Sequence, residues 1–214
     1  QICEIDCREQ GGLGSFLVAD NLLFMQNRIY DISNVDRPEL ISTYNYPFGS
    51  FYTISDSLLF TAGTGFDIYN IANLDSVQQV FWTDPREHGI TNVRVEDMVV
   101  KNRTCFTISN NKGLSIFSFE DVENPELLYY RHDGGSLFTT LIWEDRMYSY
   151  EGTSRLFSID ISDPTNPVKN DHELQLDNSN EWRNTPEFLQ YDNYLYLFGD
   201  DAMRIVDCSD PENM

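Results

Sequence analysis

Basic residues are scarce in this sequence of 214 residues. Lys and Arg number 14 against 35 Asp and Glu, which gives a formal net charge of −21. A surface this negative repels phosphate backbones and anionic membranes, so we expect no nucleic-acid partner. The acidic residues are spread through the predicted turns, which is typical of a solvated surface; a cation-binding face is the alternative.

Long apolar runs are also missing. No stretch approaches the roughly 18 apolar residues that a membrane helix needs, so we expect no membrane insertion. The first residues lack the basic and apolar segments of a signal peptide, so we expect Gln1 to begin a mature chain or an excised fragment. With 41% hydrophobic and 14% aromatic residues, the chain has enough apolar surface for a buried core.

Motifs that carry catalysis are absent too. The sequence has no Gly-x-Ser-x-Gly elbow, no phosphate-binding Gly-rich loop and no Cys/His pair in a plausible context. A chain this acidic offers paired carboxylates by chance, so carboxylates alone do not predict a glycosidase. We therefore predict no catalytic residue and no cofactor.

The sequence does contain an internal repeat. A phrase of alternating apolar and polar residues, followed by a turn of Asn, Asp and Pro, recurs about every 40 to 50 residues. A period of this length without helical periodicity is typical of the four-stranded blades of a β-propeller. The five copies cover residues 28–38, 67–77, 115–125, 157–167 and 203–214.

Each repeated phrase follows a predicted β-hairpin, whose turn carries residues that tolerate tight-turn dihedral angles. The predicted turns are Asp20-Asn21, Asp56-Ser57, Asn102-Arg103, Asp145-Arg146 and Asp192-Asn193. A fourth strand follows the phrase in the first four units, whereas the fifth unit ends after its third strand. Residues 2–8 lie in the fourth-strand position relative to the first hairpin, so we expect them to complete the last unit and to cover its open edge.

We predict an all-β fold, a single five-bladed β-propeller of four-stranded antiparallel blades over residues 1–214. The N-terminal strand closes the last blade in this prediction. The blades span residues 15–45, 51–82, 91–131, 137–174, and 186–208 together with 2–8.

The repeated phrase resembles the LVIVD repeat, a propeller-forming unit of bacterial exported and surface proteins. The matching stretches are RIVDCSDPEN from Arg204, SIDISDPTNP from Ser158 and, less closely, IYDISN from Ile29. His88-Gly89 matches a His-Gly pair that this family tends to carry before the inner strand. The resemblance implies a propeller fold and an exported or surface protein without an assigned reaction.

The four cysteines are few enough to consider one by one. Cys105 aligns with apolar positions of the other second strands, so we expect a buried, inert thiol. Cys208 ends the last third strand and Cys3 begins the strand expected to pair with it, which predicts a Cys3–Cys208 disulfide, with Cys7–Cys208 as the alternative. Such a bond would indicate an oxidising compartment, in agreement with export.

Ligand-binding candidates lie in the predicted loops between a fourth strand and the next inner strand, which share one rim of a propeller. They combine aromatic side chains with all three histidines of the chain: Tyr46, Phe48, Trp82, His88, His132, His172 and Trp182. His88, His132 and His172 are weak metal candidates because no two of them have ligand spacing, and solvated loop residues are the simpler interpretation. Asn102 begins the sequon Asn102-Arg103-Thr104 and is a glycosylation candidate at a hairpin turn.

These observations predict a non-catalytic extracellular or cell-surface propeller that acts as a binding or scaffold module for a protein or glycan. Self-assembly into homo-oligomers or filaments is a variant, in which residues 2–8 complete a neighbour's blade. A metal-dependent hydrolase that uses the histidine-bearing loops is the alternative from another class.

Overall fold

The structure is a computed structural model, and its described residues are 16–25, 27–44, 49–63, 66–83, 95–109, 113–131, 137–151, 155–170, 173–175, 187–199 and 203–210. The chain divides into two compact units. One comprises residues 1–92 and 121–124, and the other comprises residues 93–120 and 125–214.

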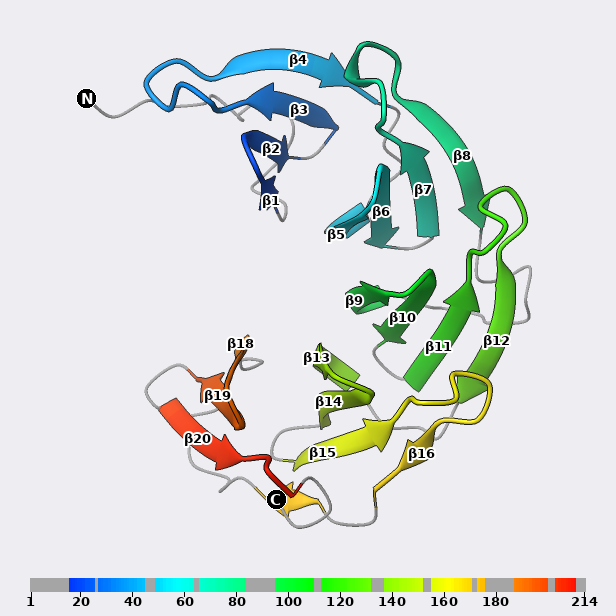
Figure 1. Ribbon diagram of the computed structural model, residues 1–214, viewed down its shortest axis with the longest axis vertical. Coiled ribbons are helices and arrows are strands. Elements are labelled where there is room, and N and C mark those ends of the chain that lie inside the picture. The colour runs from blue at the N-terminus through cyan, green and yellow to red at the C-terminus, as the bar shows by residue number, and fades with distance from the viewer. Residues whose placement is uncertain are drawn as a thin grey trace. The chain divides into compact units, whose positions relative to one another are not determined.

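Two antiparallel sheets of four strands make up the first unit, and the strands of each sheet follow the order of the chain (Figure 1). The first sheet contains β1 (Phe16–Ala19), β2 (Leu22–Met25), β3 (Arg28–Asp31) and β4 (Glu39–Thr43). The second sheet contains β5 (Gly49–Ser55), β6 (Leu58–Gly63), β7 (Phe66–Asn70) and β8 (Gln78–Thr83). A short 3-10 helix, η2 (Leu74–Ser76), precedes β8.

Three antiparallel sheets make up the second unit. The third sheet contains β9 (Val95–Lys101), β10 (Thr104–Ser109), β11 (Gly113–Ser118) and β12 (Glu126–Arg131). The fourth contains β13 (Leu137–Trp143), β14 (Arg146–Glu151) and β15 (Arg155–Asp160), and both β16 (Val168–Lys169) and β17 (Leu174–Gln175) pair with β15. The fifth contains β18 (Glu187–Tyr191), β19 (Tyr194–Phe198) and β20 (Met203–Asp207).

The first hairpin of every sheet turns through two residues, the first of which has a positive φ. Asp and Asn supply this conformation in four sheets, because their short polar side chains tolerate the left-handed region. The predicted turns are confirmed in the first, second, third and fifth sheets. In the fourth sheet, the prediction is wrong by one residue. There Trp143 pairs with Arg146, so the turn is Glu144-Asp145 and Glu144 has a φ of 51°.

The repeated phrase forms the same hydrogen bonds in all five sheets. The residue that ends each third strand accepts, through its side chain, the backbone N–H two residues later; the distance from Ser33 N to Asp31 Oδ1 is 2.7 Å. The residue between them donates its own N–H to the carbonyl of the hairpin turn, as from Cys208 to Asn193 at 2.8 Å. The accepting side chains are Asp31, Asn70, Ser118, Asp160 and Asp207.

A second side-chain turn follows in four copies, where Asn34, Asn73, Asp121 and Asp163 each accept the N–H two residues later. These Asp and Asn side chains therefore bond to their own backbone, as the turn residues of the repeated phrase are expected to do.

Successive side chains of a β-strand point to opposite faces of its sheet, so the fourth sheet packs against the third sheet with one face and against the fifth sheet with the other. Met147, Phe157 and Ile159 of the fourth sheet pack with Phe106 and Ile116 of the third. The intervening residues of the fourth sheet pack with the fifth sheet in a cluster of Tyr148, Tyr150, Leu156, Leu195, Leu197, Val206 and Cys208. A corresponding cluster around Phe24, Ile29, Leu59 and Tyr69 joins the two sheets of the first unit. Burial of such side chains is the main stabilising contribution.

The fold is thus all-β, with five antiparallel sheets that have the form of propeller blades, and this part of the prediction is confirmed. Residues 2–8 lie outside the described residues, so closure of the last sheet stays a prediction. Within the described part of the chain, no helix has the length and apolar character needed to span a membrane.

Candidate functional site

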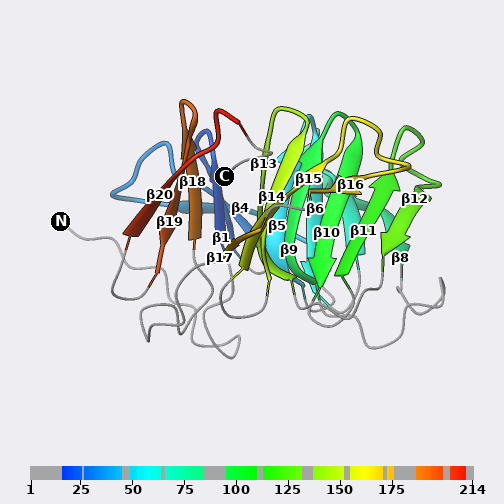
Figure 2. The ribbon, with the colours of Figure 1, turned by 90° about the horizontal axis from the view of Figure 1, so that it is seen from below.

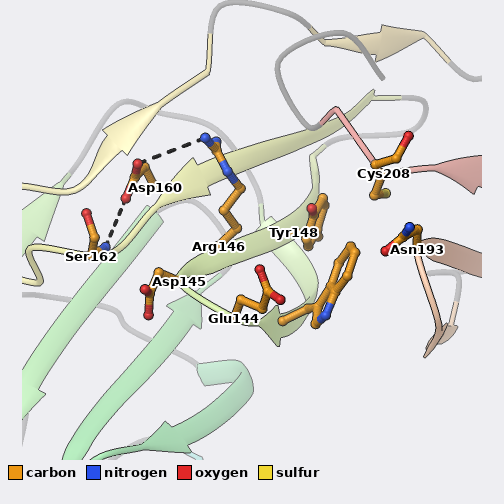
Figure 3. A pocket seen from close by; sticks show the side chains of 10 residues that line it. Glu144, Asp145, Arg146, Tyr148, Asp160, Ser162, Asn193 and Cys208 are labelled. Carbon is orange, nitrogen blue, oxygen red and sulfur yellow. Dashed lines mark hydrogen bonds and ion pairs between the residues drawn. The ribbon is translucent and has the colours of Figure 1, made fainter.

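A pocket in the second unit lies between the fourth and fifth sheets, and we call it the fourth–fifth pocket. It has a volume of about 360 Å³. Figure 2 shows that the β13–β14 and β18–β19 hairpin turns lie at the same end of their sheets, and the pocket lies among these turns. Its lining comprises Trp143, Glu144, Asp145, Arg146, Tyr148, Asp160, Ser162, Asn193, Cys208 and Ser209 (Figure 3).

A smaller pocket of about 210 Å³ lies between the third and fourth sheets, and we call it the third–fourth pocket. Its lining comprises Lys101, Asn102, Thr104, Phe106, Asp145, Ile161, Ser162 and Pro164. Counted from the hairpin turns and the third strands, all of these positions except that of Pro164 line the fourth–fifth pocket one repeat later. The two pockets are therefore repeat-related versions of one frame.

Three positions of this frame have different residues in the fourth–fifth pocket and the third–fourth pocket. Tyr148 takes the position of Phe106, and the other sheets have Phe24, Phe60 and Tyr196 there. Cys208 takes the position of Ile161, which the other sheets fill with Ile32, Ile71 and Phe119. Arg146 takes the position of Thr104, which is Leu22 and Leu58 in the first unit. The pocket therefore gathers a phenol, a thiol and a guanidinium.

The thiol and the phenol of the pocket lie against each other. Cys208 is 2% exposed and Tyr148 is 1% exposed. Burial raises the pKa of Cys208 to about 11, while the hydrogen bond with Tyr148 acts in the opposite direction. Burial likewise raises the pKa of Tyr148. Both groups are protonated and neutral at physiological pH, so this thiol is a poor nucleophile.

Charged groups line the rest of the pocket. The Arg146 guanidinium lies 4.0 Å from a carboxylate oxygen of Asp160 (Figure 3). Hydrogen bonds from the backbone N–H and the side chain of Ser162 hold the pKa of Asp160 below its ordinary value. Lys101 donates to the Glu144 carbonyl oxygen at the turn with the unfavourable φ. A two-residue hairpin turn requires this positive φ in every sheet, and a Glu gains less there than Asp or Asn.

An aromatic surface completes the pocket. The rings of Trp143 and Tyr148 are stacked, with centroids 6.3 Å apart and an interplanar angle of 24°. Trp143 is half-buried whereas Tyr148 is almost fully buried, so the indole supplies the accessible aromatic surface in a lining that also contains Asn193, Asp160 and Ser162. Pockets of this kind bind small molecules through aromatic contact and a few oriented polar groups.

Most of the predicted ligand residues fall outside the described residues. This is the case for Tyr46, Phe48, His88, His132, His172 and Trp182, and the side chain of Trp82 in β8 is not described either. The loop-face ligand site, the metal-dependent alternative and self-assembly through residues 2–8 therefore stay predictions. Across the described ranges, no group of three or more His, Cys, Asp or Glu is arranged to hold a metal ion.

The predicted Cys3–Cys208 disulfide is not formed in the structure, where Cys208 is a free thiol. The physical reason lies in the alternation of β20, which directs Cys208 with Val206 into the apolar cluster against the fourth sheet. Cys3 and Cys7 lie outside the described residues. Cys105 is fully buried and free, and burial raises its pKa, so the prediction of a buried, inert thiol is confirmed.

Asn102 lies at the β9–β10 turn, as predicted, and lines the third–fourth pocket. The sequence did not predict either pocket, since the fourth turn was predicted at Asp145-Arg146 and Arg146 was therefore assigned to the turn rather than to the second strand. The available signal was the replacement of repeated apolar residues by Arg146, Tyr148 and Cys208, which becomes visible once each second strand is aligned on its hairpin turn.

Comparisons with known proteins agree with the fold. The chain superposes on the crystal structure of the computationally designed Ika8 protein with a TM-score of 0.65 and 9% sequence identity, over 92% of this chain and 58% of that protein. For the computationally designed Ika4 protein the TM-score is 0.55 at 8% identity, over 78% of this chain and 94% of that protein. Identities this low support the fold alone. A search of the curated proteins found no match.

A family comparison bears on the repeat itself. Residues 150–170 and 190–214 match the model of the LVIVD repeat. These segments contain the third strands and turns of the fourth and fifth sheets, β15 and β20. The predicted resemblance is confirmed: two segments of this chain match the LVIVD repeat, and its sheets have the form of propeller blades.

Proposed function

We propose that this protein is a non-catalytic binding module, outside the cell or at the cell surface, that holds a neutral glycan in the fourth–fifth pocket. The observation that carries the proposal is that departures from the repeat gather at this pocket. They are Glu144 in the turn, Arg146 and Tyr148 in β14, and Cys208 after β20. Among the five sheets, only this pocket has a charged residue at the start of the second strand and a thiol after the third strand, where stability alone would favour the Leu and Ile of other sheets.

The chemistry of the lining favours a sugar. An aromatic ring such as that of Trp143, which stacks on the buried Tyr148, packs against the apolar C–H face of a pyranose ring, while planar polar groups bind its hydroxyls. Asn193 and Asp160 supply such groups in the same pocket. Because each hydroxyl both donates and accepts, a lining that mixes carboxylate, amide, guanidinium and serine groups suits it.

Charge and size narrow the ligand class. A net charge of −21 disfavours anionic glycans, which leaves neutral ones. A pocket of about 360 Å³ is of the size that holds a small molecule or a sugar unit. A stable protein partner instead needs a broad interface of roughly 1,000 Å² or more.

Isothermal titration with cellohexaose, maltohexaose and xylohexaose tests the proposal. We expect at least one of them to bind, and Asn193→Ala to weaken that binding about tenfold, the equivalent of one well-made hydrogen-bonded contact. The matched control is Asn21→Ala, which changes the same turn position in the first sheet. In both variants the backbone carbonyl that caps the third strand is retained.

The control variant should bind as the wild type does. Absence of binding to all three hexasaccharides would overturn the proposal of a neutral-glycan site. Equal weakening by Asn193→Ala and Asn21→Ala would also overturn it, because the effect would then not be specific to the fourth–fifth pocket.

A further inference from the structure

The fourth–fifth and third–fourth pockets adjoin each other. Asp145 of the β13–β14 turn and Ser162 after β15 line both of them. The Asp145 side chain is 74% exposed, so the wall between the pockets is open to solvent. From this arrangement, we propose that the two pockets are consecutive subsites of one groove that takes an extended oligosaccharide. The inference rests on the proposed function and names the form of its ligand.

Repeat geometry supports an extended ligand. The two pockets are built from equivalent positions of consecutive sheets, so they present turns and strand ends in the same order. A polymer of repeating sugar units matches a surface of repeating subsites, as extended ligands match the surfaces of other repeat proteins. Occupying the second subsite then costs little additional entropy, because the first subsite already holds the chain.

The second subsite differs from the first in its chemistry. It has no counterpart of the Trp143–Tyr148 stack, since Lys101 and Phe106 occupy those positions. Asn102 and Thr104 provide its hydrogen-bonding groups, whereas the Lys101 amine bonds to the β13–β14 turn. The fourth–fifth pocket would therefore hold one sugar unit through aromatic contact, and the third–fourth pocket would bind the hydroxyls of a following unit.

The geometry of the shared wall also fits this assignment. Lys101 Nζ lies 3.1 Å from Asp145 Oδ1 and bonds to the Glu144 carbonyl as well. These contacts hold the turn that separates the subsites in one place. A fixed spacing between two subsites is what allows a single linear chain to occupy both.

Chain-length dependence tests the inference. We expect the hexasaccharide that binds best to bind at least about fivefold more tightly than its disaccharide, because only the longer chain reaches the second subsite. Asn102→Gly removes a side chain of that subsite and retains the left-handed turn, since Asn102 has a φ of 48°. It should weaken hexasaccharide binding about fivefold and leave disaccharide binding within about twofold.

Asp56→Gly is the matched control, because Asp56 has a φ of 54° at the equivalent turn of the second sheet. It should change neither affinity. Equal affinity for both chain lengths, or equal loss for both in Asn102→Gly, would overturn the two-subsite groove. If Asn193→Ala still weakened both lengths, the single-pocket function would stand; if no sugar bound at all, the proposed function itself would fail.

Discussion

At the third–fourth interface, side chains connect the two sheets directly. Lys101 reaches from β9 to Asp145 in the turn of the fourth sheet, with 3.1 Å between Nζ and Oδ1. Deeper in the interface, Asp97 of β9 accepts the backbone N–H of Thr140 in β13 at 2.8 Å. Phe106 and Ile161 fill the space between the sheets. This interface is tied by charge, by a hydrogen bond and by apolar packing.

The fourth–fifth interface has other residues at each of these positions. Trp143 and Asn193 stand where the Lys101–Asp145 ion pair stands one repeat earlier. Thr139 and Phe188 replace the Asp97–Thr140 pair, so no carboxylate is available there. Equivalent backbone positions therefore carry side chains with different roles in the two interfaces. The third–fourth interface uses Lys101, Asp145 and Asp97 to hold its sheets together, whereas the fourth–fifth interface has an aromatic and an amide side chain at the positions of that ion pair.

Removing the apolar filling of the third–fourth interface should have the largest effect. Phe106 is 3% exposed inside its cluster, so Phe106→Ala should lower the free energy of unfolding by about 3 to 5 kcal/mol. Urea denaturation measures the change. Val35→Ala, at a position 71% exposed, is the control and should change stability by less than about 0.5 kcal/mol. A loss below about 1 kcal/mol in Phe106→Ala would contradict the packing described here.

Much of this fold was accessible from sequence, because the alternation of apolar residues and the Asp and Asn turns are local signals. The hairpin turns were predicted in four sheets for that reason. The prediction for the turn of the fourth sheet was wrong because that turn places a Glu rather than Asp or Asn in the left-handed region. This turn, Glu144-Asp145, lines the candidate pocket. The pocket itself depends on which residues of neighbouring sheets meet, as Tyr148 meets Cys208, and a single repeat carries no such information.

Titration of Asp97 should reveal its place between the sheets. Burial raises the pKa of Asp97 to about 6 from an ordinary value of 3.8, and burial has the same effect on Asp67. Between pH 3.8 and about pH 6, the Asp97 carboxyl keeps its proton in the folded protein and has lost it in the unfolded chain. The free energy of unfolding should therefore fall as the pH rises from about 4 to about 6, by about 2 to 3 kcal/mol for Asp97, and level off above.

Asp97→Asn cannot ionise, so it should remove roughly half of this pH dependence and leave the part that belongs to Asp67. Denaturant midpoints measured across this pH range report the slope separately from any change in overall stability. A slope identical to that of the wild type would show that Asp97 has no such shift.

Exchanging the aromatic residues of the two interfaces is a finer test of their difference. Phe106→Tyr buries a hydroxyl opposite Ile161 and should cost about 1 to 2 kcal/mol, because no partner awaits it. The double variant Phe106→Tyr/Ile161→Cys recreates the Tyr148–Cys208 pair and should recover part of that loss. Thermal or urea unfolding of the single and double variants gives the coupling. Zero coupling would mean that the thiol and the phenol are neighbours without interaction.

The surface ion pair should contribute least. Lys101→Met removes the contact with Asp145, whose side chain is largely exposed, so the loss should be below about 1 kcal/mol and should shrink in high salt. Unfolding measured at low and high salt tests this directly. A larger loss that salt does not reduce would assign Lys101 a packing role.

The three tryptophans allow the most direct test of where a glycan binds. Trp143 lines the fourth–fifth pocket, whereas Trp82 and Trp182 belong to the loop face predicted from the sequence. The indole N–H resonances can be assigned with Trp→Phe variants and followed by NMR during titration with the hexasaccharide that binds. We predict that the Trp143 resonance shifts with the affinity seen by calorimetry while those of Trp82 and Trp182 stay in place. Shifts at Trp82 or Trp182 with an unmoved Trp143 would contradict the fourth–fifth pocket as the binding site.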